Sequence, residues 1–344
     1  MPKMFTDLVF HRLSGPTMGT RWTAQFYAPA RVNPKTLEAA LANATGEVDA
    51  QMSTWRADSD LMRLNAAKPG DWVKLPLGLI EVLAHAVMIG RASDGAFDIG
   101  TGDVVDAWGF GPNPADTDRM RTALDAPRTP AHEALDLDSQ SMSARKHAPL
   151  ILDLSAIAKG YGADKLHMAL ADFGVTHAMV GLDGEVRTQG HHPGGRPWTV
   201  AIERPDRNRR APLSVLALED AAIATSGDYR HWVQLDDGQR LSHVIDPARG
   251  GPLRDCPASV SVVAPSCMDA DAWATALMVC GVEKGTALAR RMGLNALFLT
   301  RVGDAIKRSG VGPLFETGAA GRIHPTCDPA PVAINGSKRK KAAH

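Results

Sequence analysis

The sequence predicts a single α+β unit with mixed or antiparallel sheets and packed helices. Strand-like alternation dominates the second half of the chain, whereas the strongest helical patterns lie in the first half. The two kinds of segment follow one another irregularly, without the regular β-α-β rhythm of a doubly wound parallel sheet. No internal repeat or low-complexity linker interrupts the chain before residue 325. We therefore expect one domain over residues 12–322 and a disordered, Pro-containing basic tail over 323–344.

The first half of the chain supplies one clear strand and two clear helices. Residues 20–27 alternate in polarity and are rich in Thr and aromatic side chains, which favours a half-buried strand. Asn33-Pro34 is a typical helix start, and the helix should extend to about residue 52. A second helix is expected over residues 77–92, where Asp94-Gly95 ends the pattern.

The middle of the chain is less regular. Residues 109–145 are rich in Pro, Asp and Ala and indicate an irregular excursion with a short helix. Residues 150–154 form a short apolar strand in this interpretation. Ser155 would then cap a helix that continues to about residue 173 and ends before Gly174.

The remainder is mostly strands. They are expected over residues 176–180, 186–189, 198–203, 214–218, 222–225, 232–235, 259–263 and 296–301. Helices over residues 268–280 and 282–292 separate the last two of these strands.

Composition excludes several classes of protein. The 38 Lys and Arg side chains balance 38 Asp and Glu side chains, so neither nucleic acid nor an anionic membrane attracts the chain as a whole. No apolar stretch approaches the roughly 20 residues that span a bilayer, so we expect no integral membrane segment. The N-terminus lacks the apolar core of a secretory signal, which predicts a cytoplasmic protein for the chain as given, or a periplasmic one if the native start lies upstream. The four cysteines form no C-x-x-C pair and indicate neither a disulfide scaffold nor a zinc site.

One helix start has the features of a phosphate site. Asp153 ends an expected strand, Ser155 follows as a cap, and Lys159 lies in the first helical turn. Free N–H groups and the positive end of the helix dipole favour a phosphate there, and a lysine adds to the attraction. A capped helix with a solvated lysine is the alternative. The common nucleotide-binding and hydrolase signatures (G-x-x-x-x-G-K-[ST], G-x-G-x-x-G after a strand, G-x-S-x-G) are absent from the sequence.

Two further segments contain residues that could bind a metal ion or act as a general base. Asp271 and Thr275 are four residues apart and share one helix face, where a carboxylate and a hydroxyl suit a hard cation such as Mg²⁺. Ordinary helix capping explains an acidic first turn equally well. His243 lies in an alternating segment that ends at Asp246-Pro247, and an imidazole there could act as a general base near neutral pH. A purely structural histidine is the alternative.

Nine short motifs follow one another in the order typical of one protein family. They are residues 18–20 (MGT), 52–61 (MSTWRADSDL), 95–99 (GAFDI), 108–111 (WGFG), 153–160 (DLSAIAKG), 184–186 (GEV), 225–229 (TSGDY), 242–247 (SHVIDP) and 271–277 (DAWATAL). In these motifs the chain resembles the ApbE family of flavin transferases, over roughly residues 12–320. The resemblance implies an ApbE-type, T-fold-like unit. It also implies an FAD:protein FMN transferase, which uses Mg²⁺ to move FMN from FAD to a Ser or Thr hydroxyl of a partner flavoprotein and releases AMP.

The resemblance also assigns roles to individual residues by motif position. The residues that it implies for the FAD site are Met18, Trp55, Ala96, Phe97, Asp98, Asp153, Lys159 and Ile245. The implied metal ligands are the side chains of Asp271 and Thr275 with the carbonyl of Ala156, and His243 is the candidate base. Trp55 stands where the family usually has Tyr, and either ring can stack on a flat heterocycle.

The partner implied by the resemblance is another protein. The acceptor segment of such partners reads Asp-x-x-[Ser/Thr]-Gly-Ala-Thr, and this chain does not contain it. Two alternatives stay open from sequence. One is a Mg²⁺-dependent FAD pyrophosphatase, in which water replaces the acceptor hydroxyl; the other is a non-catalytic FAD-binding protein, against which the presence of Lys159, His243, Asp271 and Thr275 together argues.

Overall fold

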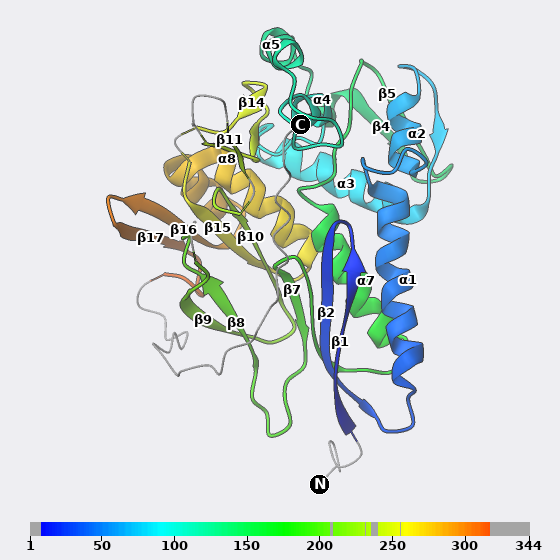
Figure 1. Cartoon of the computed structure of the whole chain (residues 1–344), viewed down its shortest axis with the longest axis vertical. Coiled ribbons are helices and arrows are strands. Elements are labelled where there is room, and N and C mark those ends of the chain that lie inside the picture. Colours follow the sequence, from blue (N-terminus) through cyan, green and yellow to red (C-terminus); the bar gives the residue numbers. More distant parts are fainter. Residues whose placement is uncertain (1–7, 207–208, 231, 235–239, 255, 317–344) are drawn as a thin grey trace.

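The computed structural model describes residues 8–206, 209–230, 232–234, 240–254 and 256–316. Its centre is an eight-stranded sheet with the order β1-β2-β6-β7-β10-β15-β16-β17, in which every neighbouring pair is antiparallel (Figure 1). Its strands are β1 (Leu8–Thr17), β2 (Thr20–Pro29), β6 (His177–Leu182), β7 (Glu185–Gln189), β10 (Ala222–Gly227), β15 (Ser259–Ala264), β16 (Asn295–Val302) and β17 (Ala305–Val311). The predicted α+β class with antiparallel sheets is confirmed.

The sheet consists of two four-stranded halves joined at a short seam. At this seam β7 pairs with β10 through Arg187 opposite Ala222 and Val186 opposite Ile223. By contrast, six residue pairs join β2 to β6 and six join β10 to β15. The two halves are therefore least extensively paired where β7 begins.

Long helices cover one face of each half. Helix α1 (Pro34–Met52) lies beside α7 (Ala158–Ala171), and α7 packs on β6 and β7 (Figure 1). Helix α8 (Cys267–Arg291) packs on β10 and β15. The first turns of α7 and α8 are in contact, so the starts of the two helices meet beside the seam.

The opposite face is covered by a hairpin of β8 (Trp198–Glu203) and β9 (Pro212–Leu218). The apolar cluster between hairpin and sheet consists of Ile202, Leu216, Leu218, Ile223, Val263, Leu297 and Leu299. Both faces of the second half of the sheet are covered, so β15 is buried along its whole length. Its sequence is accordingly a continuous run of small and apolar residues.

The other elements gather at one end of the sheet (Figure 1). The helices are α2 (Asp60–Ala66), α3 (Leu77–Ala92), α4 (Gly102–Ala107), α5 (Thr117–Asp125) and α6 (Ala131–Ala134). The strands are β3 (Val73–Lys74), β4 (Leu135–Asp138), β5 (Ser143–Lys146), β11 (Trp232–Gln234), β12 (Arg240–Ser242), β13 (Ile245–Asp246) and β14 (Gly251–Pro252). None of the helices in the described part of the chain is long and apolar enough to cross a membrane.

The segment before α7 differs from the sequence prediction. Residues 150–154 are not a strand, because side chains and loops satisfy their backbone: the Asn65 amide pairs with both the N–H and the carbonyl of Leu152, at 2.8 and 2.9 Å. Ser155 is not the helix cap either. Helix α7 begins at Ala158, with Ile157 as the preceding residue.

Further comparisons between predicted and observed elements concern the region of His243, residues 109–145 and residues 268–292. His243 lies in a bend between β12 and β13, not within a strand, because the Val244 N–H turns back to the Ser242 hydroxyl at 3.2 Å. The expected irregular excursion at 109–145 contains α5, α6, β4 and β5. The two helices expected over 268–280 and 282–292 agree with α8, whose helical backbone is interrupted at Gly281, where φ is 72° and ψ is −177°. The predicted tail at 323–344 lies outside the described residues.

Candidate functional site

The chain turns sharply just before α7. The Asp153 carboxylate accepts hydrogen bonds from the Ser155 N–H, at 2.8 Å, and from the Ser155 hydroxyl. This side-chain turn brings the chain into α7 within three residues of Ser155. Burial raises the pKa of Asp153, and the hydrogen bonds from Ser155 and Thr54 oppose that shift. The Asp153 N–H donates to the Ile99 carbonyl at 2.8 Å, which ties the turn to the loop that contains Asp98.

The first turn of α7 touches α8 through Gly160. A Cβ atom at this position would lie 2.3 Å from the Cys267 carbonyl oxygen and 2.8 Å from the Asp271 Cβ. Only glycine therefore permits this approach of the two helices. The Gly160 N–H donates to Asp271 Oδ2 at 2.9 Å, so the predicted metal ligand is held at the start of α7.

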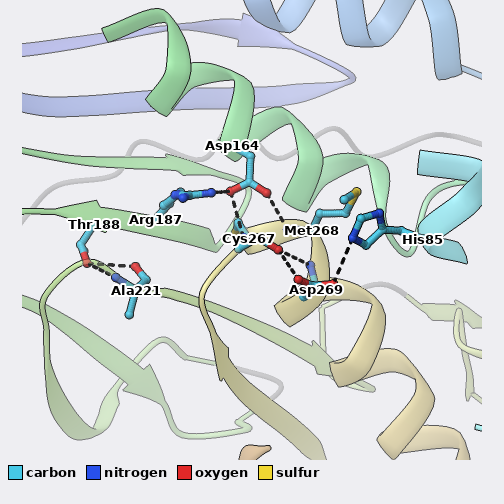
Figure 2. Close-up of polar contacts among 9 residues, drawn as sticks. His85, Asp164, Arg187, Thr188, Ala221, Cys267, Met268 and Asp269 are labelled. Atoms are coloured by element: carbon cyan, nitrogen blue, oxygen red, sulfur yellow. Dashed lines mark hydrogen bonds and ion pairs between the residues drawn. The ribbon is translucent and has the colours of Figure 1, made fainter. Parts of the chain in front are cut away.

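The start of α8 is capped by a side chain of α7. The Asp164 carboxylate accepts the N–H groups of Cys267 and Met268, each at 2.9 Å, and forms an ion pair with Arg187 of β7 (Figure 2). A carboxylate at a helix N-terminus satisfies free N–H groups and complements the helix dipole. This cap sets the position of α8 along α7, and consequently the position of Asp271 one turn later.

Lys159 is held in an acidic cluster at the start of α7. Its ammonium donates to Glu185 Oε1 at 2.7 Å and lies 3.8 Å from Asp183 Oδ2. Burial alone would lower the pKa of Lys159, but the negative charges of Glu185, Asp271 and Asp183 outweigh burial and raise it. The ammonium is therefore charged at neutral pH and paired, in contrast to the solvated lysine that sequence alone left open.

Asp271 is a buried carboxyl of this cluster with a strongly raised pKa. Burial raises its pKa to about 7, and the charge of Glu185 adds to the shift. Lys159 and the Gly160 N–H oppose the shift without reversing it. An ionised Asp271 is thus costly unless a further positive charge lies nearby.

The donors predicted for a metal fit a hard divalent cation. Thr275 lies one turn after Asp271 on α8, and its hydroxyl is 2.8 Å from the Ser226 hydroxyl of β10. Ala156 lies half-buried in the turn before α7. Among the described residues, no group of three or more His, Cys, Asp and Glu side chains is arranged to hold a metal. The predicted ligand set of Asp271, Thr275 and the Ala156 carbonyl contains one carboxylate only. All three groups are oxygen donors, and they lie beside an excess of negative charge, which Mg²⁺ favours.

Other residues predicted for the FAD site come from the β1–β2 turn and from the loop after α3. Met18 has a φ of 42° in the β1–β2 turn and packs against a cluster that includes Ala163 and Cys267. Phe97 is buried in the main core, and Ala96 beside it is half-buried. Asp98 Oδ1 accepts N–H groups from Gly100 and Ala131 at 2.8 and 3.0 Å, while burial raises its pKa.

The other predicted residues lie farther along the same end of the molecule. Trp55 follows α1 and is 62% exposed, so its ring can stack on a ligand. Ile245 of β13 packs in a separate apolar cluster with residues of α4. The His243 ring lies edge-on to Phe110, with ring centroids 6.4 Å apart. The described contacts place Met18 beside the start of α8 and Ile245 beside α4. The Gly102 N–H at the start of α4 donates to the Ile151 carbonyl at 2.9 Å, which links α4 to the chain before α7.

Sequence reasoning missed Glu185, Asp183 and Asp164. Glu185 is part of a quoted motif, yet nothing local indicates that it contacts Lys159, 26 residues earlier. The Asp183-Gly184 pair was an available signal, because such a pair marks a tight turn that directs the next residue into a strand. Asp164 carries no local signal, since it caps a helix 103 residues away in sequence.

The fold and the site together describe an α+β protein with a charged centre suited to an anionic ligand and a divalent cation. A sequence profile of the ApbE family matches residues 18–298. The FAD:protein FMN transferase of Vibrio cholerae serotype O1 is 38% identical over 300 residues, which are 86% of this chain and 89% of that protein. The FAD:protein FMN transferase of Escherichia coli (strain K12) is 34% identical over 310 residues, 89% of this chain and 88% of that protein.

Solved structures agree in fold. The flavin transferase ApbE from Vibrio cholerae superimposes with a TM-score of 0.78 at 34% identity, covering 88% of this chain and 97% of that one. The apo form of the flavinyl transferase ApbE from Pseudomonas stutzeri gives a TM-score of 0.77 at 33% identity, with 88% and 95% covered. The chain belongs to the ApbE family.

Proposed function

We propose that this chain is an FAD:protein FMN transferase, which moves FMN from FAD to a Ser or Thr hydroxyl of a partner flavoprotein and releases AMP. The observation that carries the proposal is the cluster at the start of α7, where the single ammonium of Lys159 lies among the carboxylates of Glu185, Asp183 and Asp271. Its excess of negative charge calls for a cation, and the lysine and helix start favour a phosphate. The relatives of known structure and sequence carry the same activity in their names.

The binding roles follow the motif positions and the charged cluster at the start of α7. Lys159 receives the diphosphate of FAD, and Met18, Trp55, Ala96, Phe97, Asp98, Asp153 and Ile245 receive the rest of the molecule. Asp271, Thr275 and the Ala156 carbonyl would hold Mg²⁺. When bound, Mg²⁺ supplies charge neutralisation to the diphosphate oxygens. Lys159 adds to that neutralisation and orients the phosphates.

The reaction is a displacement at one phosphorus atom. The acceptor oxygen forms a bond to the phosphorus of the FMN half, and the bond from that phosphorus to the bridging oxygen breaks. AMP leaves with the bridging oxygen. The hydroxyl proton goes to His243, the base that we assign, and such a displacement depends mainly on positioning and charge.

The partner is a second protein with an Asp-x-x-[Ser/Thr]-Gly-Ala-Thr segment. This chain contains no such segment. The acceptor must present its hydroxyl at the charged centre, so its segment docks at the end of the sheet where α7 and α8 begin. The cytoplasmic location expected for the chain as given stays a prediction.

Intact-mass spectrometry of an acceptor domain tests the proposal directly. The domain carries the acceptor segment and is incubated with this chain, FAD and Mg²⁺. We expect an adduct of the mass of FMN, and no adduct when FMN replaces FAD, when EDTA removes the metal, or when Ala replaces the acceptor Ser or Thr. Release of FMN and AMP without an adduct would indicate a pyrophosphatase, and binding of FAD without turnover would indicate a binding protein.

A further inference from the structure

Glu185 combines burial with one carboxylate oxygen that has no partner among the described residues. Its side chain is 4% exposed, and Oε1 accepts a hydrogen bond from the Lys159 ammonium at 2.7 Å. Oε2 is also buried but has no hydrogen-bond partner among the described residues. A buried carboxylate oxygen without a partner is costly to the fold, so hydrogen bonding within the protein does not explain this residue.

Glu185 has the shorter side chain of the pair and lies at a fixed position in the sheet. Glu185 is the first residue of β7, directly after a tight turn in which Asp183 has a φ of 56° and Gly184 a φ of 118°. The Thr20 hydroxyl donates to Asp183 Oδ1 at 2.9 Å and braces that turn. Lys159, by comparison, has four rotatable side-chain bonds. The short, sheet-anchored carboxylate therefore orients the long lysine, not the reverse.

Two other carboxylates compete for the same ammonium. Asp183 lies 3.8 Å from Lys159 Nζ, and Asp271 also interacts with it electrostatically. A lysine released from Glu185 would move toward Asp271, where it would occupy the place of a metal ion. Glu185 thus keeps the ammonium at the start of α7 and leaves Asp271 available.

We propose that Glu185 is a positioning residue for FMN transfer, which acts by holding the Lys159 ammonium in place for the diphosphate. This inference rests on the proposed function. Preorganisation of a charged group before substrate binds avoids loss of side-chain entropy during the reaction. It predicts that Glu185 matters only when Lys159 is present.

A double-mutant cycle tests this dependence. We compare Glu185→Gln, Lys159→Ala and the double variant, with Glu38→Gln on the exposed face of α1 as the matched control. Glu185→Gln should lower kcat for FMN transfer by at least about tenfold and change the KM for FAD by less than about threefold. In the Lys159→Ala background it should lower kcat by less than about twofold, because the group on which it acts is gone. Glu38→Gln should match the original chain.

Two kinetic outcomes would overturn the inference. One is an equal loss of kcat in both backgrounds, which would assign Glu185 a general structural role. The other is an unchanged or higher kcat for Glu185→Gln when Lys159 is present. Thermal unfolding of each variant identifies a loss that reflects misfolding, and Glu185→Asp, which keeps the charge but shortens the side chain, should recover part of the loss if it folds.

A second readout needs no turnover. Lysines are labelled briefly with acetic anhydride, and the modification of Lys159 is compared by peptide mass spectrometry with that of Lys165 on the same helix. Lys159 should react several-fold faster in Glu185→Gln than in the original chain, whereas Lys165 should not change. Equal labelling of Lys159 would overturn the inference. If labelling changes as expected but the original chain transfers no FMN, the proposed function fails while the contact stands.

Discussion

At the scale of single residues, the site depends on how one carboxyl is perturbed. Asp271 is buried beside Glu185, and its pKa rises to about 7 from an ordinary 3.8. The folded protein therefore binds this proton more tightly than the unfolded chain does. Without metal, the contribution of Asp271 to stability is present at low pH and is lost as pH rises from about 4 through about 7.

This perturbation predicts a pH-dependent response to metal. Mg²⁺ needs the ionised carboxylate, so it should raise the thermal unfolding midpoint more at about pH 8 than at about pH 6. Differential scanning fluorimetry with and without Mg²⁺ measures the shift. In Asp271→Asn the shift should disappear at both pH values. A shift of the same size in that variant would exclude Asp271 as a ligand.

At the scale of elements, the contact between α7 and α8 determines how the site is assembled. The two helices lie on different halves of the sheet, and their first turns meet because Gly160 has no side chain and Asp164 caps α8. A change at this contact should alter stability and the site together. A change on an exposed helix face should alter stability without affecting the site.

Two glycine substitutions separate these cases. Gly160→Ala places a methyl group against the Cys267 carbonyl and should lower the free energy of unfolding by about 2 kcal/mol, with loss of transfer activity. Gly46→Ala, on the exposed face of α1 with no atom near the added Cβ, should raise it by about 0.5–1 kcal/mol. Urea denaturation measures both. Equal effects of the two substitutions would contradict the described packing.

At the scale of the whole molecule, a group of histidines lies away from the site, around β6 and the chain between β7 and β8. The His177 and His191 rings are 4.9 Å apart, and the His192 ring is 4.0 Å from Trp198. Burial lowers the pKa of His177, with a further contribution from His191, and burial also lowers the pKa of His192. The imidazoles of His177 and His192 are accommodated in their neutral form.

Their neutral state predicts acid sensitivity of the fold. The pKa of each of these two histidines is lower in the folded protein than in the unfolded chain, where it is about 6.5. Their contribution to stability is therefore complete above about pH 6.5 and is lost as pH falls through the folded pKa. The histidine contribution to the thermal midpoint should therefore drop between about pH 7 and about pH 5, while the contribution of Asp271 rises over the same range. In His177→Gln the drop should be smaller, as scanning fluorimetry across that range would measure. An identical drop in His177→Gln and in the original chain would show that residues other than His177 cause the acid sensitivity.

Elements that depend on neighbouring residues in sequence agree with the prediction, and elements that depend on distant residues do not. Helices α1 and α3 lie where their caps and periodicity predict them, because those signals come from residues within one or two turns. The strand expected at 150–154 is absent because Asn65, far away in sequence, satisfies Leu152. Local pattern cannot report such a partner.

The sequence by itself determined the α+β class, the family and the set of chemical groups: Lys159, Asp271 and Thr275 are recognisable from their motifs. Only the tertiary structure decided how these groups are charged and held. Glu185 reaches Lys159, Gly160 touches Cys267, and Asp164 caps α8 because two halves of a sheet bring together segments up to 111 residues apart. The physical reason is that motifs specify residue types, whereas burial and electrostatic pairing depend on neighbours that only the folded chain supplies.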